Sequence, residues 1–307
     1  MSYSARMQKN HLFSVYLAPR GNPRMADVGN QIAQLYMSPF DSLIGFVGES
    51  GSGKSVLIRG MFPGLEMTND DEGVNVRPLP LLQLHDQSFF SAHTYHIDIR
   101  FESAFTQMTD IVQAINDATA MGKRVIVEHF DLLYPAIKRN AHLLVGVGEE
   151  IIITRPTMFG PDPRDLQKIV SKSVIYRRMA HTAEDLCEFC LLGYGIGSFE
   201  HSDVRHGFIL SYMDKRAINI LDLEHQVNEM IKKDIPISYL DRTHILIGDQ
   251  RHYCTGPRMH VRTTGEIVNF RLHPEILVDE MTGRNMLVGL VGTPPSYAIG
   301  DINQIFV

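Results

Sequence analysis

The stretch Gly48-Glu49-Ser50-Gly51-Ser52-Gly53-Lys54-Ser55 matches the pattern G-x-x-x-x-G-K-[ST] at every specified position. Residues 43–47 before it form a short apolar run typical of a buried strand, and residues 56–59 after it continue as the first turn of a helix. Backbone N–H groups of such a loop, together with the N-terminus of its helix, surround a polyphosphate. The alternative is a glycine-rich turn that matches by chance. The flanking strand and helix favour a site for a nucleoside triphosphate.

In this pattern the lysine reaches the β and γ phosphates, and the hydroxyl of the last residue ligates Mg²⁺. The sequence therefore predicts ATP or GTP together with Mg²⁺ as ligands. We expect every residue from Gly48 to Ser55 to contact the nucleotide, Lys54 to act also in catalysis, and Ser55 to bind the magnesium ion.

The composition limits the class of protein. The chain has 307 residues, 44% of them hydrophobic and 21% charged, which predicts an ordinary globular protein of two domains. It contains no apolar run of the ~20 residues that span a bilayer, and its start lacks the apolar core of a signal peptide. Three cysteines do not suggest a disulfide framework, which favours the reducing cytoplasm.

The net charge of −6 is shared by both halves, so neither has the basic excess of a general nucleic-acid binder. We expect no membrane and no DNA partner. A local site for an RNA end stays open.

The first half alternates between strand and helix patterns. Strand patterns occupy residues 94–100, 124–128 and 151–154, and helical spacing of apolar residues occupies 24–37 and 104–121. This alternation predicts an α/β domain whose parallel sheet has helices on both faces. Ligands of such sheets lie at the carboxyl ends of the strands, where Asp98 and Glu128 fall.

A carboxylate opposite a phosphate-binding loop can hold Mg²⁺ or orient the attacking nucleophile, whereas an isolated one at a strand end is often a helix cap or a surface residue. We expect Asp98 and Glu128 to be catalytic and Asp98 also to bind Mg²⁺. The polar stretch 67–80 is either a lid or substrate loop beside this site or a solvated acidic loop.

The first half also resembles a known family over about residues 40–135. The phosphate-binding loop, His96-Ile-Asp98-Ile-Arg100 and the strand ending in Val-Ile-Val-Glu128 occur in the order found in the small bacterial ATPase of threonylcarbamoyladenosine tRNA modification. This resemblance implies that Ser55, Asp98 and Glu128 form the Mg²⁺ and catalytic set.

Four segments of the second half occur in the order of another family. They are residues 181–186 (HTAEDL), 222–237 (DLEHQVNEMIKKDIPI), 254–257 (CTGP) and 260–267 (HVRTTGEI). Together they resemble the second additional domain of alanyl- and threonyl-tRNA synthetases, which hydrolyses mischarged aminoacyl-tRNA. The resemblance implies an α+β editing-like domain, which we place at residues 165–307. Glycine and proline at residues 160–163 predict a linker between it and the P-loop domain of residues 1–160.

That family builds a metal site from His-x3-His on a helix and Cys-x3-His on a strand and loop. Here Asp185 replaces the second helical histidine, and the other pair is Cys254-x5-His260. The resemblance implies that His181, Asp185, Cys254 and His260 bind Zn²⁺, for which all four are suitable ligand types. The metal-free alternative is that His181 and Asp185 hydrogen-bond each other while Cys254 packs in the core.

Cys187 and Cys190 also form a C-x-x-C pair, but no second pair accompanies them. On a helix, Cys190 lies about 180° from His181, so it cannot share the metal-binding face. We expect both to be core cysteines.

The most concrete hypothesis is an ATP-binding P-loop domain joined to an aminoacyl-tRNA editing-like domain, with ATP hydrolysis in a tRNA-linked role. Metal-dependent deacylation of aminoacyl-tRNA by the second domain stays open. One alternative is a small-molecule kinase of the nucleoside kinase type with Asp98 as the base. Another is a nucleotide-gated module that binds an RNA end without hydrolysing it. Asp185 at the second histidine position favours the last alternative, and Glu128 favours turnover.

Overall fold

The computed structural model describes residues 12–67, 93–214 and 216–292. Contacts divide the chain into one unit of Met1–Tyr16 and Arg24–Lys172 and a second of Leu17–Pro23 and Ser173–Val307. The domain boundary predicted from the sequence lies between residues 160 and 165. The boundary between the two units lies instead inside helix α8 (Pro163–Gly193), one continuous helix that also carries His181 and Asp185. Residues 68–80 of the expected lid or acidic loop lie outside the described residues.

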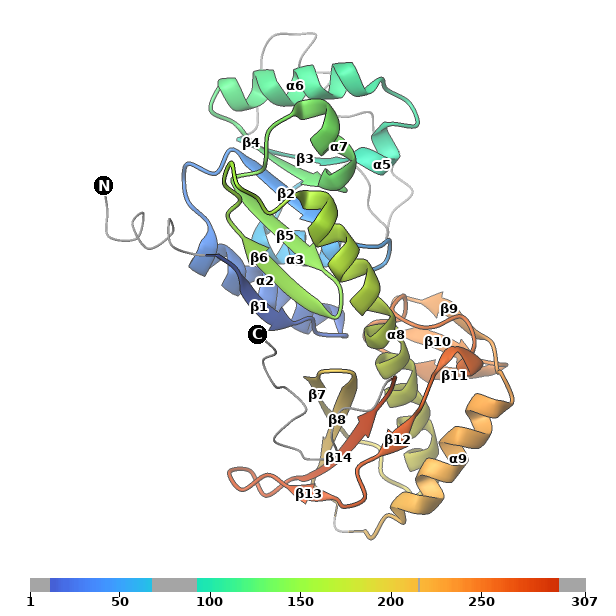
Figure 1. The fold of residues 1–307 in the computed structure, drawn as a ribbon. Helices are drawn as coiled ribbons and strands as arrows, with labels where there is room; N and C mark the ends of the chain where they lie inside the picture. Colours follow the sequence, from blue (N-terminus) through green and yellow to red (C-terminus); the bar gives the residue numbers. More distant parts are fainter. Residues whose placement is uncertain (1–11, 68–92, 215, 293–307) are drawn as a thin grey trace. The chain divides into compact units, whose positions relative to one another are not determined.

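The first unit contains a six-stranded sheet with the order β1-β6-β5-β2-β4-β3 (Figure 1). Its strands are β1 (Ser14–Leu17), β2 (Leu43–Val47), β3 (Thr94–Asp98), β4 (Arg124–Glu128), β5 (Leu143–Val147) and β6 (Glu150–Thr154). Strand β2 pairs in parallel with β4 and β5, and β3 pairs in parallel with β4. The register places Asp98 opposite Glu128 and Glu128 opposite Phe46, so the carboxyl ends of these strands meet at one edge.

The expectation of an entirely parallel sheet is wrong at β6, which pairs antiparallel with β5. Only residues 148 and 149 separate the two strands, and a parallel neighbour needs a crossover of a dozen or more residues. Strand β5 is not among the predicted strands, although its residues LLVGV form a continuous apolar run and are all buried.

Helices α2 (Asn22–Tyr36), α3 (Lys54–Met61), α5 (Ile99–Glu102), α6 (Met108–Ala120) and α7 (Phe130–Ile137) accompany the sheet. Leu43 and Val47 belong to the same hydrophobic cluster as residues of α6 and α7. Ile44 and Phe46 point to the opposite face and are equally buried, so both faces of the sheet are covered. Helices α2 and α3 approach closely at Gly60, where an added Cβ would lie 2.1 Å from the carbonyl oxygen of Ala26.

The second unit combines helices with two antiparallel sheets. One sheet has the order β12-β14-β8-β7, with β13 beside β14, and the other has the order β11-β10-β9. Their strands are β7 (Glu200–Val204), β8 (Gly207–Tyr212), β9 (Ile237–Asp241), β10 (His244–Ile247), β11 (Gln250–Tyr253), β12 (Arg271–Leu272), β13 (Leu277–Val278) and β14 (Asn285–Leu290). Helix α9 (Ile220–Lys232) and a 3₁₀ turn at Thr264–Glu266 complete the unit.

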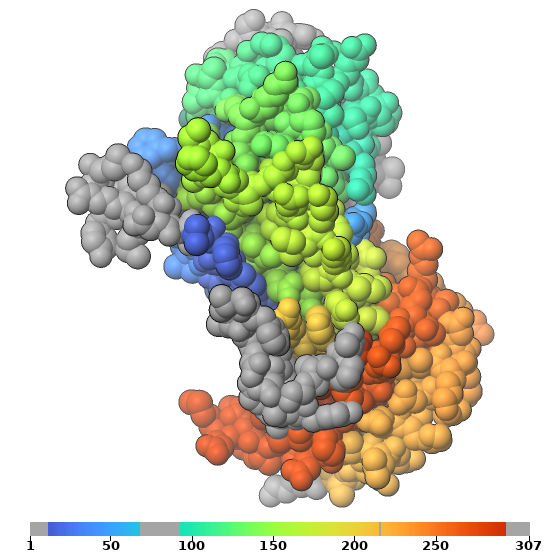
Figure 2. All heavy atoms as spheres, viewed as in Figure 1, coloured from blue at the N-terminus to red at the C-terminus, as the bar shows by residue number. Residues whose placement is uncertain are grey.

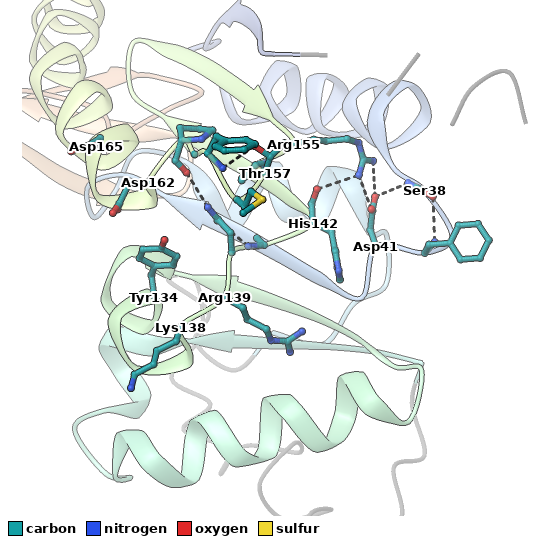
Figure 3. A pocket seen from close by; sticks show the side chains of 18 residues that line it. Ser38, Asp41, Tyr134, Lys138, Arg139, His142, Arg155, Thr157, Asp162 and Asp165 are labelled. Atoms are coloured by element: carbon teal, nitrogen blue, oxygen red, sulfur yellow. Dashed lines mark hydrogen bonds and ion pairs between the residues drawn. The ribbon is translucent and has the colours of Figure 1, made fainter. Parts of the chain in front are cut away.

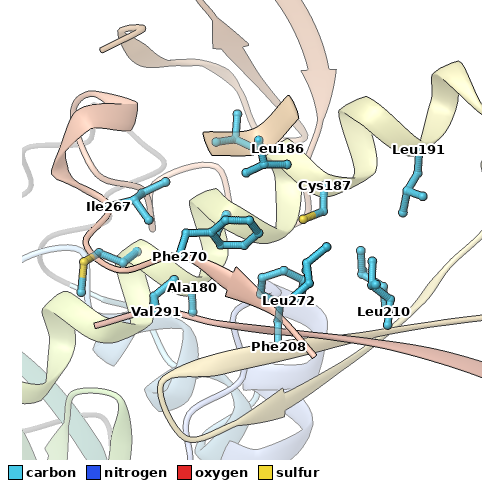
Figure 4. Packing of buried hydrophobic residues seen from close by; sticks show 14 of the residues in the cluster. Ala180, Leu186, Cys187, Leu191, Phe208, Leu210, Ile267, Phe270, Leu272 and Val291 are labelled. Atoms are coloured by element: carbon cyan, nitrogen blue, oxygen red, sulfur yellow. The ribbon is translucent and has the colours of Figure 1, made fainter. Parts of the chain in front are cut away.

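Apolar residues of α8 form much of the core of the second unit. Ala180, Leu186 and Cys187 pack with Phe208 and Phe270 (Figure 4). Cys190 packs at the border of this cluster, and its Sγ lies 3.8 Å from the sulfur of Met230. Both cysteines are free thiols, and burial raises the pKa of Cys190 to about 11. The prediction that they are core cysteines is confirmed.

Amphipathic helices cover the outside of each unit. Helices α6 and α9 lie at the surface of their own units (Figure 2), and α9 buries only Leu223 and Val227 completely. Within the part of the chain that the structure describes, no helix has both the length and the apolarity needed to cross a bilayer.

Candidate functional site

The loop from Gly48 to Gly53 connects β2 to α3, as the sequence predicts. Gly48, Gly51 and Gly53 have φ angles of 149°, 75° and 89°, in the region that favours glycine. A Cβ atom on Gly48 would also lie 2.5 Å from the carbonyl oxygen of Val147. Glycine at these positions therefore allows the tight path that exposes backbone N–H groups at the start of α3.

Lys54 and Ser55 form the first turn of α3. The Lys54 ammonium donates hydrogen bonds to the carbonyl oxygens of Gly48 (3.2 Å) and Glu49 (3.0 Å), so its side chain folds over the loop. The Ser55 hydroxyl donates to Oε1 of Glu128 at 3.0 Å. The expected phosphate-binding lysine, magnesium-binding hydroxyl and catalytic carboxylate thus converge at one point.

Glu128 is buried and has several partners besides Ser55. His96 Nε2 lies 3.1 Å from its Oε1, and Lys54 Nζ lies 3.8 Å from its Oε2. Burial opposes ionisation of Glu128, but His96, Lys54 and Ser55 outweigh burial and lower the pKa of Glu128 to about 2. The carboxylate is therefore anionic throughout the physiological range. The contact of His96 with Glu128 is absent from the sequence analysis, which names this histidine only as part of a motif.

Asp98 ends β3 beside Glu128, and its carboxylate accepts a hydrogen bond from the backbone N–H of Phe101 at 3.2 Å. Asp98 therefore caps α5 and also lies at the predicted edge of the sheet, and its catalytic role stays a prediction. Glu102, a buried residue of the same helix, is not among the predicted site residues. Burial, and next the charge of Asp98, raise the pKa of Glu102 to about 7. Glu128 at this edge is thus ionised throughout the physiological range, whereas Glu102 titrates near neutrality.

The second unit brings together the four predicted metal ligands. His181 and Asp185 come from α8, and Cys254 and His260 from the chain after β11; one ligand atom from each lies within 4.8 Å of all the others. Cys254 Sγ is 3.2 Å from His181 Nε2 and 3.8 Å from His260 Nε2, which is 2.9 Å from Asp185 Oδ2. Metal–ligand bonds of 2.0–2.3 Å in a tetrahedral zinc site separate the ligand atoms by about 3.3–3.8 Å. The donor types and spacing therefore fit Zn²⁺ with small adjustments.

Both imidazole rings turn Nε2 toward the cluster. Nδ1 of His181 lies 3.4 Å from Glu184 Oε2, and Nδ1 of His260 lies 3.2 Å from the carbonyl oxygen of Pro257. Acceptors at Nδ1 keep the proton there and leave the Nε2 lone pair for a metal, the usual arrangement of zinc-binding histidines.

The protonation states of the cluster set the conditions for metal binding. Burial lowers the pKa of His181, so its ring is neutral. Burial opposes ionisation of Asp185, but His181 and His260 outweigh it and the pKa of Asp185 is lowered. Burial raises the pKa of the Cys254 thiol. A metal must therefore displace the thiol proton when it binds.

The metal-free hypothesis takes a different form from the one expected. Within the described residues, Asp185 pairs with His260 rather than with His181. His181 Nε2 also lies 3.2 Å from the carbonyl oxygen of Gly256, to which the other tautomer of the ring can donate. The His181 proton is therefore on Nδ1 in the metal-binding arrangement and on Nε2 in the metal-free one.

A second group of titratable residues lies next to the cluster on α8. Oε1 of Glu188 is 3.3 Å from His201 Nδ1, and Oε2 is 3.9 Å from His252 Nε2. Burial, and next the charge of Asp185, raise the pKa of Glu188 to about 8. The carboxyl is therefore protonated in the folded protein at neutral pH.

Replacing Glu188 by glutamine is expected to stabilise the metal-free protein increasingly as the pH rises from 5 to 8. Over this range the unfolded chain releases the Glu188 proton while the folded protein keeps it, which lowers the free energy of unfolding of the wild type only. We expect a relative gain of about 1–3 kcal/mol at pH 8, measured as melting temperature against pH after chelator treatment. Glu275→Gln, at an exposed site in the same unit, is the control. A pH-independent difference between Glu188→Gln and the wild type would contradict the raised pKa.

A cavity of about 1240 Å³ lies at the opposite edge of the first unit's sheet, among the chain segments before β2 and β5 and after β6 (Figure 3). Asp41 and Arg155 form a two-armed ion pair there, with N–O distances of 2.7 and 2.8 Å. Asn140 donates a hydrogen bond to the carbonyl oxygen of Pro161 at 2.9 Å. None of the residues that the sequence analysis assigns to a site lines this cavity.

Comparisons with known proteins leave the family open. No protein-family model matches the chain, and no curated protein matches it. Among solved structures, YdiB of Bacillus subtilis aligns with 52% of this chain and 95% of its own, at 15% identity and a TM-score of 0.29. The ornithine aminotransferase of Toxoplasma gondii ME49 aligns with 84% of this chain and 70% of its own, at 10% identity and a TM-score of 0.23. Likenesses at these TM-scores carry no argument about fold or function.

Proposed function

We propose that the first unit binds a nucleoside triphosphate with Mg²⁺ and hydrolyses it. The observation that carries this proposal is the contact of Ser55 with Glu128, next to Lys54 and at the end of the glycine-rich loop. The loop N–H groups and Lys54 would hold the phosphates, and Ser55 would hold Mg²⁺, which neutralises charge that develops on the phosphoryl group. Glu128, permanently anionic, would orient the attacking water or accept its proton.

The positions of Asp98 and Glu128 favour hydrolysis of the nucleotide over transfer of its phosphoryl group to a small molecule. A kinase would use Asp98 as the base near the acceptor hydroxyl, but this carboxylate caps α5. Glu128 is the carboxylate in contact with Ser55. The arrangement therefore supports water as the acceptor.

Lys54→Ala is expected to abolish thermal stabilisation by nucleotide. In the wild type, ATP or GTP with Mg²⁺ at 100 times its Kd adds about 2.7 kcal/mol to the free energy of unfolding, and each kcal/mol corresponds to about 2–4 °C in a domain of this size. Lys168→Ala, which removes an exposed lysine of the same unit, is the matched control and should keep the shift. A full shift in Lys54→Ala would refute the phosphate-binding role of the loop.

The second unit supports a further candidate function, zinc-dependent hydrolysis of the ester at an aminoacylated RNA end. The specific observation is the convergence of His181, Asp185, Cys254 and His260. Zinc held with one open coordination position would polarise the ester carbonyl or activate water, whereas a closed shell of four protein ligands would make it structural. The protein side chains orient the ligand atoms and exclude water around them, because three of the four are buried. The tRNA-linked role proposed for nucleotide hydrolysis rests on the two family resemblances of the sequence.

A further inference from the structure

The segment Leu17–Pro23 belongs to the second unit, although the chain on either side of it belongs to the first. Its Arg20 is buried and forms a two-armed ion pair with Glu184, with Nε–Oε2 at 3.0 Å and Nη2–Oε1 at 3.2 Å. The same guanidinium donates to the carbonyl oxygens of Gly207 (2.9 Å) and Ser202 (3.1 Å) and pairs with Asp203 (3.0 Å). Arg20 is therefore held in one orientation by partners from α8 and from both strands of the β7–β8 hairpin, near its turn.

Glu184 lies between Arg20 and the metal cluster and contacts both. It precedes Asp185 on α8, and its Oε2, which Arg20 contacts, lies 3.4 Å from His181 Nδ1. The two-armed contact with Arg20 fits a carboxylate and fixes the place of both Glu184 oxygens beside His181. A fixed anion at Nδ1 keeps the proton on that nitrogen, which leaves the Nε2 lone pair directed at Cys254 Sγ, 3.2 Å away.

The backbone of the segment also packs on the loop that carries the other two ligands. The N–H of Asn22 donates to the carbonyl oxygen of Thr255 at 3.1 Å. A Cβ atom on Gly256 would lie 2.2 Å from the carbonyl oxygen of Arg20 and 3.0 Å from His181 Nε2. The segment therefore reaches the loop between Cys254 and His260 as closely as glycine permits.

We propose that Arg20 and Glu184 are positioning residues of the metal centre, and that the segment Leu17–Pro23 completes that centre from a distant part of the chain. The proposal rests on the proposed zinc site. The affinity for zinc then depends on the ion pair between Arg20 and Glu184, which are 164 positions apart and do not themselves bind the metal.

The test is the dissociation constant for zinc, measured on the 307-residue chain by competition with a chromophoric chelator. Residues that orient a zinc-binding histidine typically contribute 10–100-fold to metal affinity, so Glu184→Gln and Arg20→Ala should weaken binding by about that factor. Arg20→Lys keeps the charge but not the two-armed contact. Its zinc affinity should therefore lie between that of these two variants and that of the wild type. Asp203→Asn removes a different partner of Arg20 and should bind zinc nearly as tightly as the wild type.

A double variant separates positioning from folding. Arg20→Ala leaves Glu184 as an uncompensated buried charge, which can unfold the unit by itself. Arg20→Met combined with Glu184→Leu removes both charges, so the metal-free melting temperature should recover while zinc affinity stays about 10–100-fold weaker. The absorption spectrum of bound Co²⁺ should change as well, because the ring of His181 is no longer oriented.

The outcomes distinguish this inference from the proposed function. A wild type that binds no zinc would overturn both. A wild type that binds zinc, with the same affinity in Glu184→Gln and in the double variant, would overturn only the role of Arg20 and Glu184. An equal loss of zinc affinity in Asp203→Asn would also overturn the role of Arg20 and Glu184, because the loss would then not depend on Glu184.

Discussion

Replacing Glu128 by glutamine is expected to reduce nucleotide hydrolysis by about 100-fold or more while changing nucleotide affinity little. The amide has the shape of the carboxylate and can still accept the hydrogen bond from Ser55, but it has no charge and cannot accept a proton. The wild-type residue is ionised at every usable pH because its pKa is about 2. The loss should therefore be nearly constant from pH 6 to 9. Steady-state hydrolysis together with titration of a fluorescent nucleotide measures both quantities.

Asp98→Asn should lower hydrolysis by a similar factor if this carboxylate handles Mg²⁺, and its amide oxygen can still cap α5. Asp110→Asn changes an exposed carboxylate in the first turn of α6 and serves as the control. Near-normal rates in both Glu128→Gln and Asp98→Asn would mean that the catalytic carboxylates lie elsewhere. Lost nucleotide binding in Glu128→Gln would instead assign that residue to the binding of the nucleotide and its metal.

The zinc content of the purified protein should be near-stoichiometric and should be lost in both His181→Ala and Cys254→Ser. Each variant removes one of four ligand atoms that lie within 4.8 Å of one another, and structural zinc sites contribute apparent binding free energies of about 10–16 kcal/mol. Chelation should therefore also lower the melting temperature of the wild type. Cys190→Ser is the matched control, because this thiol packs against Met230 at the border of the core and should leave the zinc content unchanged.

The same samples test the activity of the second unit. If the site has an open position, the zinc-loaded wild type should hydrolyse aminoacyl-tRNA, and the two ligand variants should not. Zinc without hydrolysis would indicate a structural site. A metal-free wild type that still binds or protects aminoacyl-tRNA would support the RNA-end binding module and rule out the hydrolase.

Structural features that depend on residues close together in the sequence could be predicted from the sequence. Loop conformation, helix start and ligand spacing follow from local rules, so the sequence places Gly48–Ser55 between a strand and a helix and puts Asp98 and Glu128 at strand ends. His181 and Asp185 share a helix face because they are four residues apart. That these two residues lie close to Cys254 and His260 could be predicted only from the resemblance to a known family, whose motifs occur in the same order.

The tertiary structure alone decided which distant groups meet. The sequence by itself determined that the glycine-rich loop Gly48–Ser55 lies between a strand and a helix and that Cys187 and Cys190 pack in the core, because spacing and periodicity encode contacts within a few residues. It could not show that β6 turns back antiparallel to β5, that His96 contacts Glu128, or that Arg20 reaches Glu184. These contacts arise from packing between segments up to 164 residues apart, and no local preference of either partner specifies the other. The second unit therefore depends on a seven-residue segment near the start of the chain because burying the charge of Glu184 requires a partner that only the folded chain supplies.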